Sequence, residues 1–532
     1  MARSWQTVRP GPRSRSRAEL LLGAVVVAVA IYVIGYPLFV VRYPPITDLP
    51  FHASGMSILR HYWDPAFGFR EQFSLHLLEV PYVSMYAIGA LFALVLPMHV
   101  AVKAAAFVML ALLPAGLAVM FHGMRKTPLW GVLGLAAVWT NLTHWGFLNF
   151  MGALGLYAMA VGFALLAVDR PSRGHTVGLG LSLLAVFFTH IYRFPFAMLS
   201  VVGVGVLFYP ATRRIGPLLL ALLPSALVFG AWRAIAPKSI AEQGIQLKLD
   251  TSRWHEVREH VVAGFAGAAG IEEQRLFDGF LGALLVVLLC TLFWRAVLPD
   301  KRVPHPRPIA FAFGKLMLPL CLCAGYAFAY FVMPMRIGIW WYVYPREATS
   351  ALLVLLALMP DMPKIWYLRA ATVVVVSVAV GRLGFFVAEQ YFAFEKATLD
   401  FREVAKAVPQ KPRLMYLVFD HAGSSRRVTP FIHLPAWIQA EKGGALSFHF
   451  SGWNQSPIRY RTDSAAVPPG VPDRWEWTPH RFRLDQHGAF FDTFLVRSTA
   501  DPGYLFRADP NIQQTAHDGT WWLYQRSAPA QP

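Results

Sequence analysis

The sequence predicts a polytopic α-helical membrane protein that carries a soluble α/β domain at its C-terminal end. Hydrophobic residues make up 56% of the 532 residues and charged residues only 15%, whereas an average soluble domain has about 25% charged residues. Apolar runs of about 20 residues, the length that spans a bilayer, recur along the chain. From about residue 389 the composition becomes mixed and polar, and it stays so to Pro532.

The first element is expected to be a retained membrane helix with a cytoplasmic tail. The apolar run 20–41 is longer than the roughly 7–15 residues of a signal-peptide core, and no small-residue cleavage site closes it. The tail, residues 1–19, contains five arginines: Arg3, Arg9, Arg13, Arg15 and Arg17. Because positive charges stay on the cytoplasmic side of a membrane, this tail is expected to lie inside.

The transmembrane domain is expected to cover residues 20–388 with about 11 to 13 helices. After a first outer loop, 42–79, further apolar runs lie at 81–97, 100–121, 129–140, 147–168, 176–189, 194–209, 215–235, 276–297, 310–333, 348–359 and 370–387. Beyond residue 168 the basic loops alternate as the positive-inside rule requires. The four runs between 81 and 168 break this alternation, so one must be irregular, and we expect the irregularity near NLTHWGF (141–147). An odd number of spans, 11 or 13, places the C-terminal region outside.

The C-terminal region, residues 389–532, is expected to form one small extracytoplasmic α/β domain. Residues 395–408 have the apolar spacing of an amphipathic helix, and four strand-like runs follow, at 413–420, 444–450, 490–498 and 519–527. A helix that leads into several hydrophobic strands is typical of a compact layered domain.

Charge and cysteine content exclude several classes of protein. The net charge is +18, but the basic residues gather in the tail and in short loops and form no basic stripe, so no nucleic-acid partner is expected. Cys290, Cys321 and Cys323 all lie in apolar runs, which excludes a disulfide framework and a CxxC zinc site. The sequence also lacks the GxxxxGK[ST], GxSxG and HExxH motifs.

The first outer loop contains a candidate catalytic carboxylate. Asp48 lies a few residues beyond the first apolar run, preceded by Pro44 and Pro45 and followed by Pro50, so its backbone is expected to be extended or turned. His52 follows four residues later. An ionisable residue near a bilayer is a functional hypothesis by default. The alternative is a polar turn that ends a membrane helix.

Three further groups of residues are expected on the same side of the membrane as Asp48. They are Asn141, His144 and Trp145; His190, Tyr192 and Arg193; and Arg336, Trp340, Trp341, Tyr342, Tyr344, Arg346 and Glu347. Taken singly, the aromatic residues fit an interfacial belt, the arginines fit snorkelling side chains and the histidines fit structural hydrogen bonds. Together with Asp48 they suit an anionic lipid headgroup and a hydroxyl substrate, because arginine binds phosphate bidentately and a carboxylate serves as a general base.

The architecture resembles the GT-C superfamily of polyprenyl-phosphate-dependent glycosyltransferases, which includes protein O-mannosyltransferases, aminoarabinose lipid A transferases and rhizobial galacturonosyltransferases. The resemblance rests on an inside N-terminus, an outer loop with Asp48 just past the first helix, many helices and an outer C-terminal domain. It implies that Asp48 is the catalytic base and His52 a helper or metal ligand. Arg346, in YPRE, and Arg193 would bind the lipid phosphate. In the family the first acid is usually one of a pair, whereas Leu49 follows Asp48 here.

The implied reaction inverts the anomeric centre and moves a sugar from a polyprenyl-phosphate donor to a hydroxyl of a glycan, lipid or protein acceptor. His190, Tyr344, His144 and Asn141 are expected to contribute to substrate binding. No cofactor is certain, and a divalent metal ion on Asp48 and His52 is left open. Membrane lipids are expected partners, and the bacterial inner membrane is the expected location. The alternatives are a transporter or flippase of an amphipathic lipid, with polar residues on broken helices, and a non-catalytic scaffold or sensor.

Overall fold

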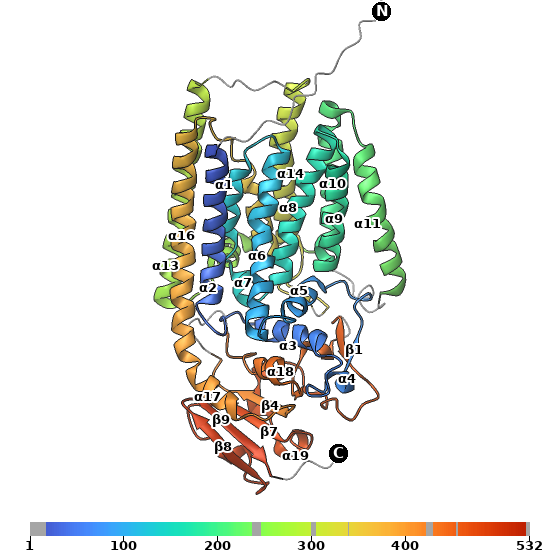
Figure 1. Cartoon of the computed structure of the whole chain (residues 1–532), viewed down its shortest axis with the longest axis vertical. Helices are drawn as coiled ribbons and strands as arrows, with labels where there is room; N and C mark the ends of the chain where they lie inside the picture. The colour runs from blue at the N-terminus through green and yellow to red at the C-terminus, as the bar shows by residue number, and fades with distance from the viewer. Residues whose placement is uncertain are drawn as a thin grey trace, which may run out of the picture.

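The structure, a computed structural model, describes residues 17–236, 246–298, 305–338, 340–421, 429–453 and 456–527. It has two parts, a bundle of long helices and a smaller domain with a mixed β-sheet at one end of that bundle (Figure 1). The arginines of the tail before Arg17 lie outside the described residues. The expected domain boundary at residue 389 falls within α16 (Trp366–Ala397).

Eight helical segments in the described part of the chain are long and apolar enough to cross a membrane. The first combines α1 (Arg17–Ala30), the π-helical turn η1 (Ile31–Gly35) and α2 (Tyr36–Phe39). The others are α6 (Met98–Gly123), α8 (Leu148–Asp169), η3 with α10 (Ile191–Arg193 and Phe194–Thr212), α11 (Gly216–Ile235), α13 (Gly267–Val297), α14 (Pro308–Val332) and α16. The chain is therefore a multi-pass membrane protein, as the sequence predicts.

Four further apolar runs form shorter elements, which explains why long helices are fewer than the 11 to 13 spans expected. They are α5 (Ser84–Phe92), the 3₁₀ helix η2 (Pro128–Ala137), α9 (Arg173–Thr189) and α15 (Pro345–Leu356). Lys126 and Trp130, at the start of η2, donate to carbonyls that follow α15. By contrast, α5 stays at the lower end beside α3 (Leu49–Arg60), and α6 starts again from that end (Figure 1). The irregular run is thus α5, and the expectation of an irregular run near NLTHWGF was wrong, because that segment forms the short helix α7 (Asn141–Trp145) between η2 and α8.

The centre of the bundle is α8. Of its most apolar 18-residue stretch, 89% is buried inside the protein. It packs closely against α6 through small residues: a Cβ atom added to Gly116 would lie 1.9 Å from the carbonyl oxygen of Gly155. Close approach of backbones at glycine is a general basis of helix association in membranes. This packing fixes the position of the lower end of α8 relative to the loops at that end of the bundle.

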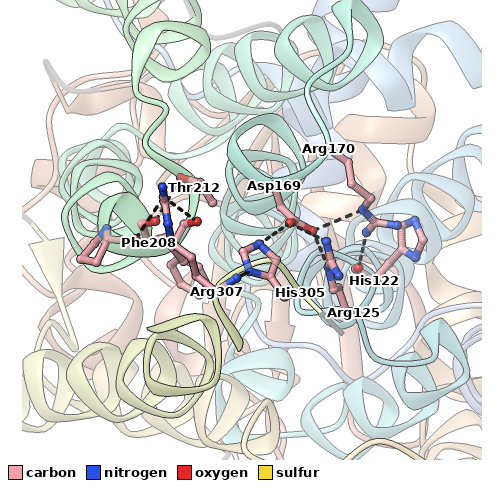
Figure 2. A network of polar contacts seen from close by, with 10 residues as sticks. His122, Arg125, Asp169, Arg170, Phe208, Thr212, His305 and Arg307 are labelled. Carbon is pink, nitrogen blue, oxygen red and sulfur yellow. Dashed lines mark hydrogen bonds and ion pairs between the residues drawn. The ribbon is translucent and has the colours of Figure 1, made fainter. Parts of the chain in front are cut away.

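At the upper end of the bundle, an ion-pair network ties the helix ends together (Figure 2). Asp169, at the end of α8, accepts hydrogen bonds from Arg125 Nε and Nη2 at 2.7 and 2.8 Å. Arg170 and His305 approach the same carboxylate at 3.6 and 3.4 Å. Arg307 donates to Pro210 and Ala211, whose carbonyls lie in the last turn of α10. Basic residues therefore gather at the end of the bundle opposite the sheet domain.

The C-terminal domain contains a five-stranded sheet in the order β5-β4-β7-β9-β8. The strands are β4 (Arg413–Val418), β5 (Ala445–Leu446), β7 (Thr493–Arg497), β8 (Ile512–Asp518) and β9 (Trp521–Arg526). β4 is parallel to β5 and β7, whereas β9 is antiparallel to β7 and β8. The helix α17 (Leu399–Ala407) packs on the sheet through Phe401, whose ring lies 5.0 Å from that of Trp521. The predicted strand 444–450 is much shorter than expected.

The first loop and the C-terminal domain form one continuous layer at the same end of the bundle. The strand β1 (Phe73–Leu75) of the loop pairs antiparallel with β6 (Ile458–Tyr460) of the domain. The helix α18 (Ala436–Lys442) packs against α3, and Ser54 donates a hydrogen bond to Gln439 across this contact (Figure 1). The domain is thereby held over the loop that contains Asp48.

Candidate active site

Asp48 is held at the start of α3 by a chain reversal between two membrane helices. Its N–H donates to the carbonyl of Trp145 at 3.2 Å, and the N–H of Thr47 donates to His144 at 2.9 Å. The reversal consists of α7 (Asn141–Trp145) and Gly146, whose φ is +101°. A Cβ on Gly146 would lie 2.7 Å from the Asp48 Cβ, so only glycine allows this approach. The polar break in NLTHWGF therefore serves to position Asp48.

The Asp48 carboxylate meets a histidine from the C-terminal domain. His433 Nδ1 lies 3.0 Å from Asp48 Oδ1, and the Asp48 side chain keeps 21% of its surface exposed. The His433 ring packs on Phe51, with ring centroids 4.4 Å apart. The carboxylate is therefore supported on one side and open on another, as a general base requires.

His52 supports the backbone near Asp48 and has no nitrogen left for another ligand. Its Nε2 lies 3.0 Å from the carbonyl oxygen of Gly146, and its Nδ1 lies 3.1 Å from the hydroxyl of Tyr86. Since a carbonyl only accepts, Nε2 donates and Nδ1 accepts from Tyr86. Burial lowers the pKa of His52, so the ring is neutral. These contacts do not fit a metal on Asp48 and His52, and the described residues contain no group of three His, Cys, Asp or Glu residues that could hold one.

Arg346 is a buried cation, and its hydrogen-bond partners among the described residues are all neutral. It lies in the first turn of α15, where its Nε donates to Tyr342 at 3.0 Å and its Nη2 to Trp341 at 2.9 Å. Its Nη1 lies 3.2 Å from His190 Nε2. The guanidinium also lies over Phe147, 4.3 Å from the ring centroid. An arginine without a carboxylate partner, at a helix N-terminus, is well placed to receive an anion.

Arg193, the other expected phosphate ligand, is already neutralised. Its Nη atoms donate to both carboxylate oxygens of Glu347 at 2.9–3.0 Å, and the two side chains are 0% and 1% exposed. The guanidinium packs against Phe150, which also lies near Arg346. The pair joins η3, at the start of α10, to α15 next to Arg346.

Tyr82 connects the two charged residues of the site. Burial raises the pKa of its phenol. Its ring lies 5.5 Å from that of His190, whose Nε2 lies 3.2 Å from Arg346 Nη1, and 6.4 Å from the ring of Tyr86. Tyr86 contacts His52, four residues after Asp48, so a chain of side-chain contacts runs from the start of α3 to Arg346.

The remaining predicted residues have defined partners within the protein. Asn141 donates to the Tyr342 hydroxyl at 2.7 Å, and His144 Nδ1 lies 3.3 Å from the hydroxyl of Tyr391. The Tyr344 hydroxyl donates to Glu256 at 2.7 Å. Tyr344 belongs to a separate cluster with Tyr330 and Val261. The structure thus groups Asp48, His52, His190 and Arg346 around Tyr82 and Tyr86, and gives Tyr344 a different environment.

Sequence reasoning missed the residues of the C-terminal domain that approach Asp48. His433 precedes α18, and Glu476 lies in the 3₁₀ turn η7 (Trp475–Trp477). Burial raises the pKa of the Glu476 carboxyl, and the charges of His433 and Asp48 act on it in opposite directions. Neither residue belongs to a motif, and no local signal in the chain could have identified them.

The fold is similar to that of a solved structure, ArnT from Cupriavidus metallidurans, in a crystal structure bound to undecaprenyl phosphate. This likeness confirms the GT-C-like fold that the resemblance predicts. The two share 14% sequence identity with a TM-score of 0.52, over 95% of this chain and 97% of that chain. No protein-family model and no curated protein sequence matches the chain. The likeness concerns the fold.

Proposed function

We propose that the protein is a membrane glycosyltransferase that moves a sugar from a polyprenyl-phosphate donor to a hydroxyl of an extracytoplasmic acceptor. One observation carries this proposal: in a GT-C-like fold, contacts through Tyr86, Tyr82 and His190 connect the start of α3, where the partly exposed carboxylate of Asp48 lies, to Arg346, a buried arginine with no carboxylate partner among the described residues. The first group suits an acceptor hydroxyl and the second a lipid phosphate. The solved relative with this fold was crystallised with undecaprenyl phosphate.

Arg346 is the proposed anchor of the donor phosphate. As the bond between the anomeric carbon and the phosphate oxygen breaks, negative charge increases on the leaving polyprenyl phosphate. A cation already oriented in a buried site stabilises that charge without reorganisation. The carbonyls of Trp341 and Tyr342 orient the guanidinium, and the Arg193–Glu347 pair keeps α15 in place beneath it.

Asp48 is the proposed general base. It removes the proton of the acceptor hydroxyl while the acceptor oxygen bonds to the anomeric carbon on the face opposite the phosphate, and this single displacement inverts the anomeric centre. The proton ends on Asp48 and the electron pair of the broken bond on the phosphate. No step involves a metal on Asp48 and His52, because the contacts of His52 do not fit a metal site.

The distribution of charge supports the proposed orientation in a bacterial inner membrane. Arg125, Arg170 and Arg307, drawn in Figure 2, flank the ends of α6, α8 and α14 that lie away from the sheet domain in Figure 1. Positive charges mark the cytoplasmic end of a membrane protein. This supports the proposal that the tail 1–19 lies in the cytoplasm and the C-terminal domain on the extracytoplasmic side.

Binding of undecaprenyl phosphate to Arg346→Gln tests the donor site. Native mass spectrometry of the purified full-length chain should show an affinity about 10- to 100-fold lower than that of the wild type, since one hydrogen bond to a charged group contributes about 1.5–3 kcal/mol. The matched control is Arg275→Gln, which changes an arginine of α13 whose side chain is 73% exposed and should bind normally. Equal affinity of Arg346→Gln and wild type would remove the support for a phosphate site here.

A further inference from the structure

We propose that a groove between the end of α10 and the start of α14 binds an anionic phospholipid, with an acyl chain in the groove and the phosphate on Arg307. These helix ends lie away from the sheet domain (Figure 1). The 19 residues of α10 begin directly after Arg193, and they span about 28 Å at 1.5 Å per residue. A lipid in this groove therefore lies about a helix length from the proposed transfer reaction and takes no part in it.

The groove is apolar and faces the surroundings of the bundle. It has a volume of about 590 Å³. Its apolar lining comes from Val206, Leu207 and Pro210 of α10 and from Ile309, Ala310 and Phe313 of α14. The side chains of Val206, Ile309 and Phe313 are 69%, 86% and 57% exposed. Apolar surface of this kind is unfavourable in water but not against hydrocarbon. An acyl chain is the apolar ligand that a membrane supplies to such a groove.

Arg307 lines the same groove and is held there by two elements. Its backbone N–H donates to His305 Nδ1 at 3.0 Å, directly before α14. Its Nη1 donates to the carbonyls of Pro210 and Ala211, in the last turn of α10, at 3.4 and 3.3 Å (Figure 2). These side-chain bonds use Nη1 alone, so within the described residues Nε and Nη2 remain for a ligand. The guanidinium fork suits the oxygens of a phosphate.

The charge around the groove favours an anionic headgroup over a zwitterionic one. Asp169, the acid of the neighbouring network, is 1% exposed, and Arg125 and Arg170 approach its carboxylate at 2.7 and 3.6 Å (Figure 2). It is therefore already neutralised by other side chains. Arg213 and Arg214 directly follow α10 and are exposed. Basic pockets between membrane helices are known as sites for anionic lipid headgroups.

The experiment measures lipid binding to the purified, delipidated full-length chain. Native mass spectrometry titrates phosphatidylglycerol and phosphatidylcholine that have identical acyl chains. We expect the first phosphatidylglycerol to bind the wild type at least about 5-fold more tightly than phosphatidylcholine, since one basic residue near an anionic lipid contributes about 1 kcal/mol. Arg307→Gln should remove this preference. Ala310→Phe, which narrows the groove, should weaken the binding of both lipids.

Thermal unfolding provides a second measurement on the same samples. Phosphatidylglycerol should raise the melting temperature of the wild type more than that of Arg307→Gln, because a ligand that binds the folded state stabilises it. The matched control is Arg295→Gln, which changes an exposed arginine in the last turn of α13 and should keep the lipid preference. Arg346→Gln should keep it as well, because Arg346 belongs to the other site.

Three results would overturn the proposal. The first is equal affinity of the wild type for the two lipids. The second is an unchanged preference in Arg307→Gln; if that variant also melts at a lower temperature without lipid, Arg307 only caps α10. The third is loss of the preference in Arg346→Gln, which would place the anionic lipid in the donor site instead.

Discussion

The buried pair Arg193–Glu347 makes a quantitative test of how the site is held together. Glu347→Gln removes the charge that neutralises Arg193, while the side chain keeps nearly the same shape. The pair is fully buried, with hydrogen bonds of 2.9–3.0 Å to both carboxylate oxygens. Breaking such a pair by changing one partner costs about 3–5 kcal/mol, because an uncompensated charge remains in the interior.

A matched exposed pair provides the control for this value. Glu403 and Lys406 also form an ion pair, at 2.7 Å, but their side chains are 57% and 71% exposed. Glu403→Gln should therefore change stability by less than about 1 kcal/mol. Thermal unfolding of both purified variants in the same detergent measures the difference. If Glu347→Gln melts at the same temperature as Glu403→Gln, the pair does not hold α10 to α15, and the support assigned to Arg193 is wrong.

Two further changes test the packing of the bundle and the pH response of the outer domain. Gly155→Ala should destabilise the protein strongly, because the new Cβ would lie 2.3 Å from the backbone of Leu112. The control is Gly23→Ala, where no atom lies within 4 Å of the new Cβ, and it should leave the melting temperature unchanged. Similar melting temperatures of the two variants would contradict the close α6–α8 contact. His449→Asn keeps an acceptor for Ser451 but does not ionise. Burial lowers the pKa of His449 from 6.5 to about 3, so the wild type loses stability as the pH falls from about 6.5 toward 3. In unfolding scans the variant should lose less stability over that range. An equal loss would show that His449 is not buried in its neutral form.

The sequence predicts the features that depend on neighbouring residues along the chain. Apolar runs predict the membrane helices, and the proline-flanked Asp48 and the YPRE segment around Arg346 mark the two charged residues of the site. Hydropathy has no direction, however, so it could not show that α5 remains at one end of the bundle while η2 runs between the two ends. The pairing of Arg193 with Glu347 is likewise a tertiary contact that neither segment reveals.

His433 illustrates the same limit at the site itself. It lies in FIHLP, far from Asp48 in sequence, and becomes a neighbour only because β6 and α18 of the domain pack on the first loop. His52, which does lie near Asp48 in sequence, uses both ring nitrogens in local contacts. Proximity along the chain therefore indicates His52, whereas the fold brings the imidazole of His433 to the Asp48 carboxylate.

The most direct test of the central claim is the activity of Asp48→Asn in cells. The experiment uses a strain in which deletion of the gene removes a sugar from the envelope glycans or lipids, and mass spectrometry detects that sugar after complementation. The control is Asp64→Asn, an exposed acid of the same loop. We predict that Asp64→Asn restores the sugar and that Asp48→Asn lowers its incorporation at least about 100-fold, the scale expected for loss of a general base. Full restoration by Asp48→Asn would contradict the assignment of Asp48 as the base.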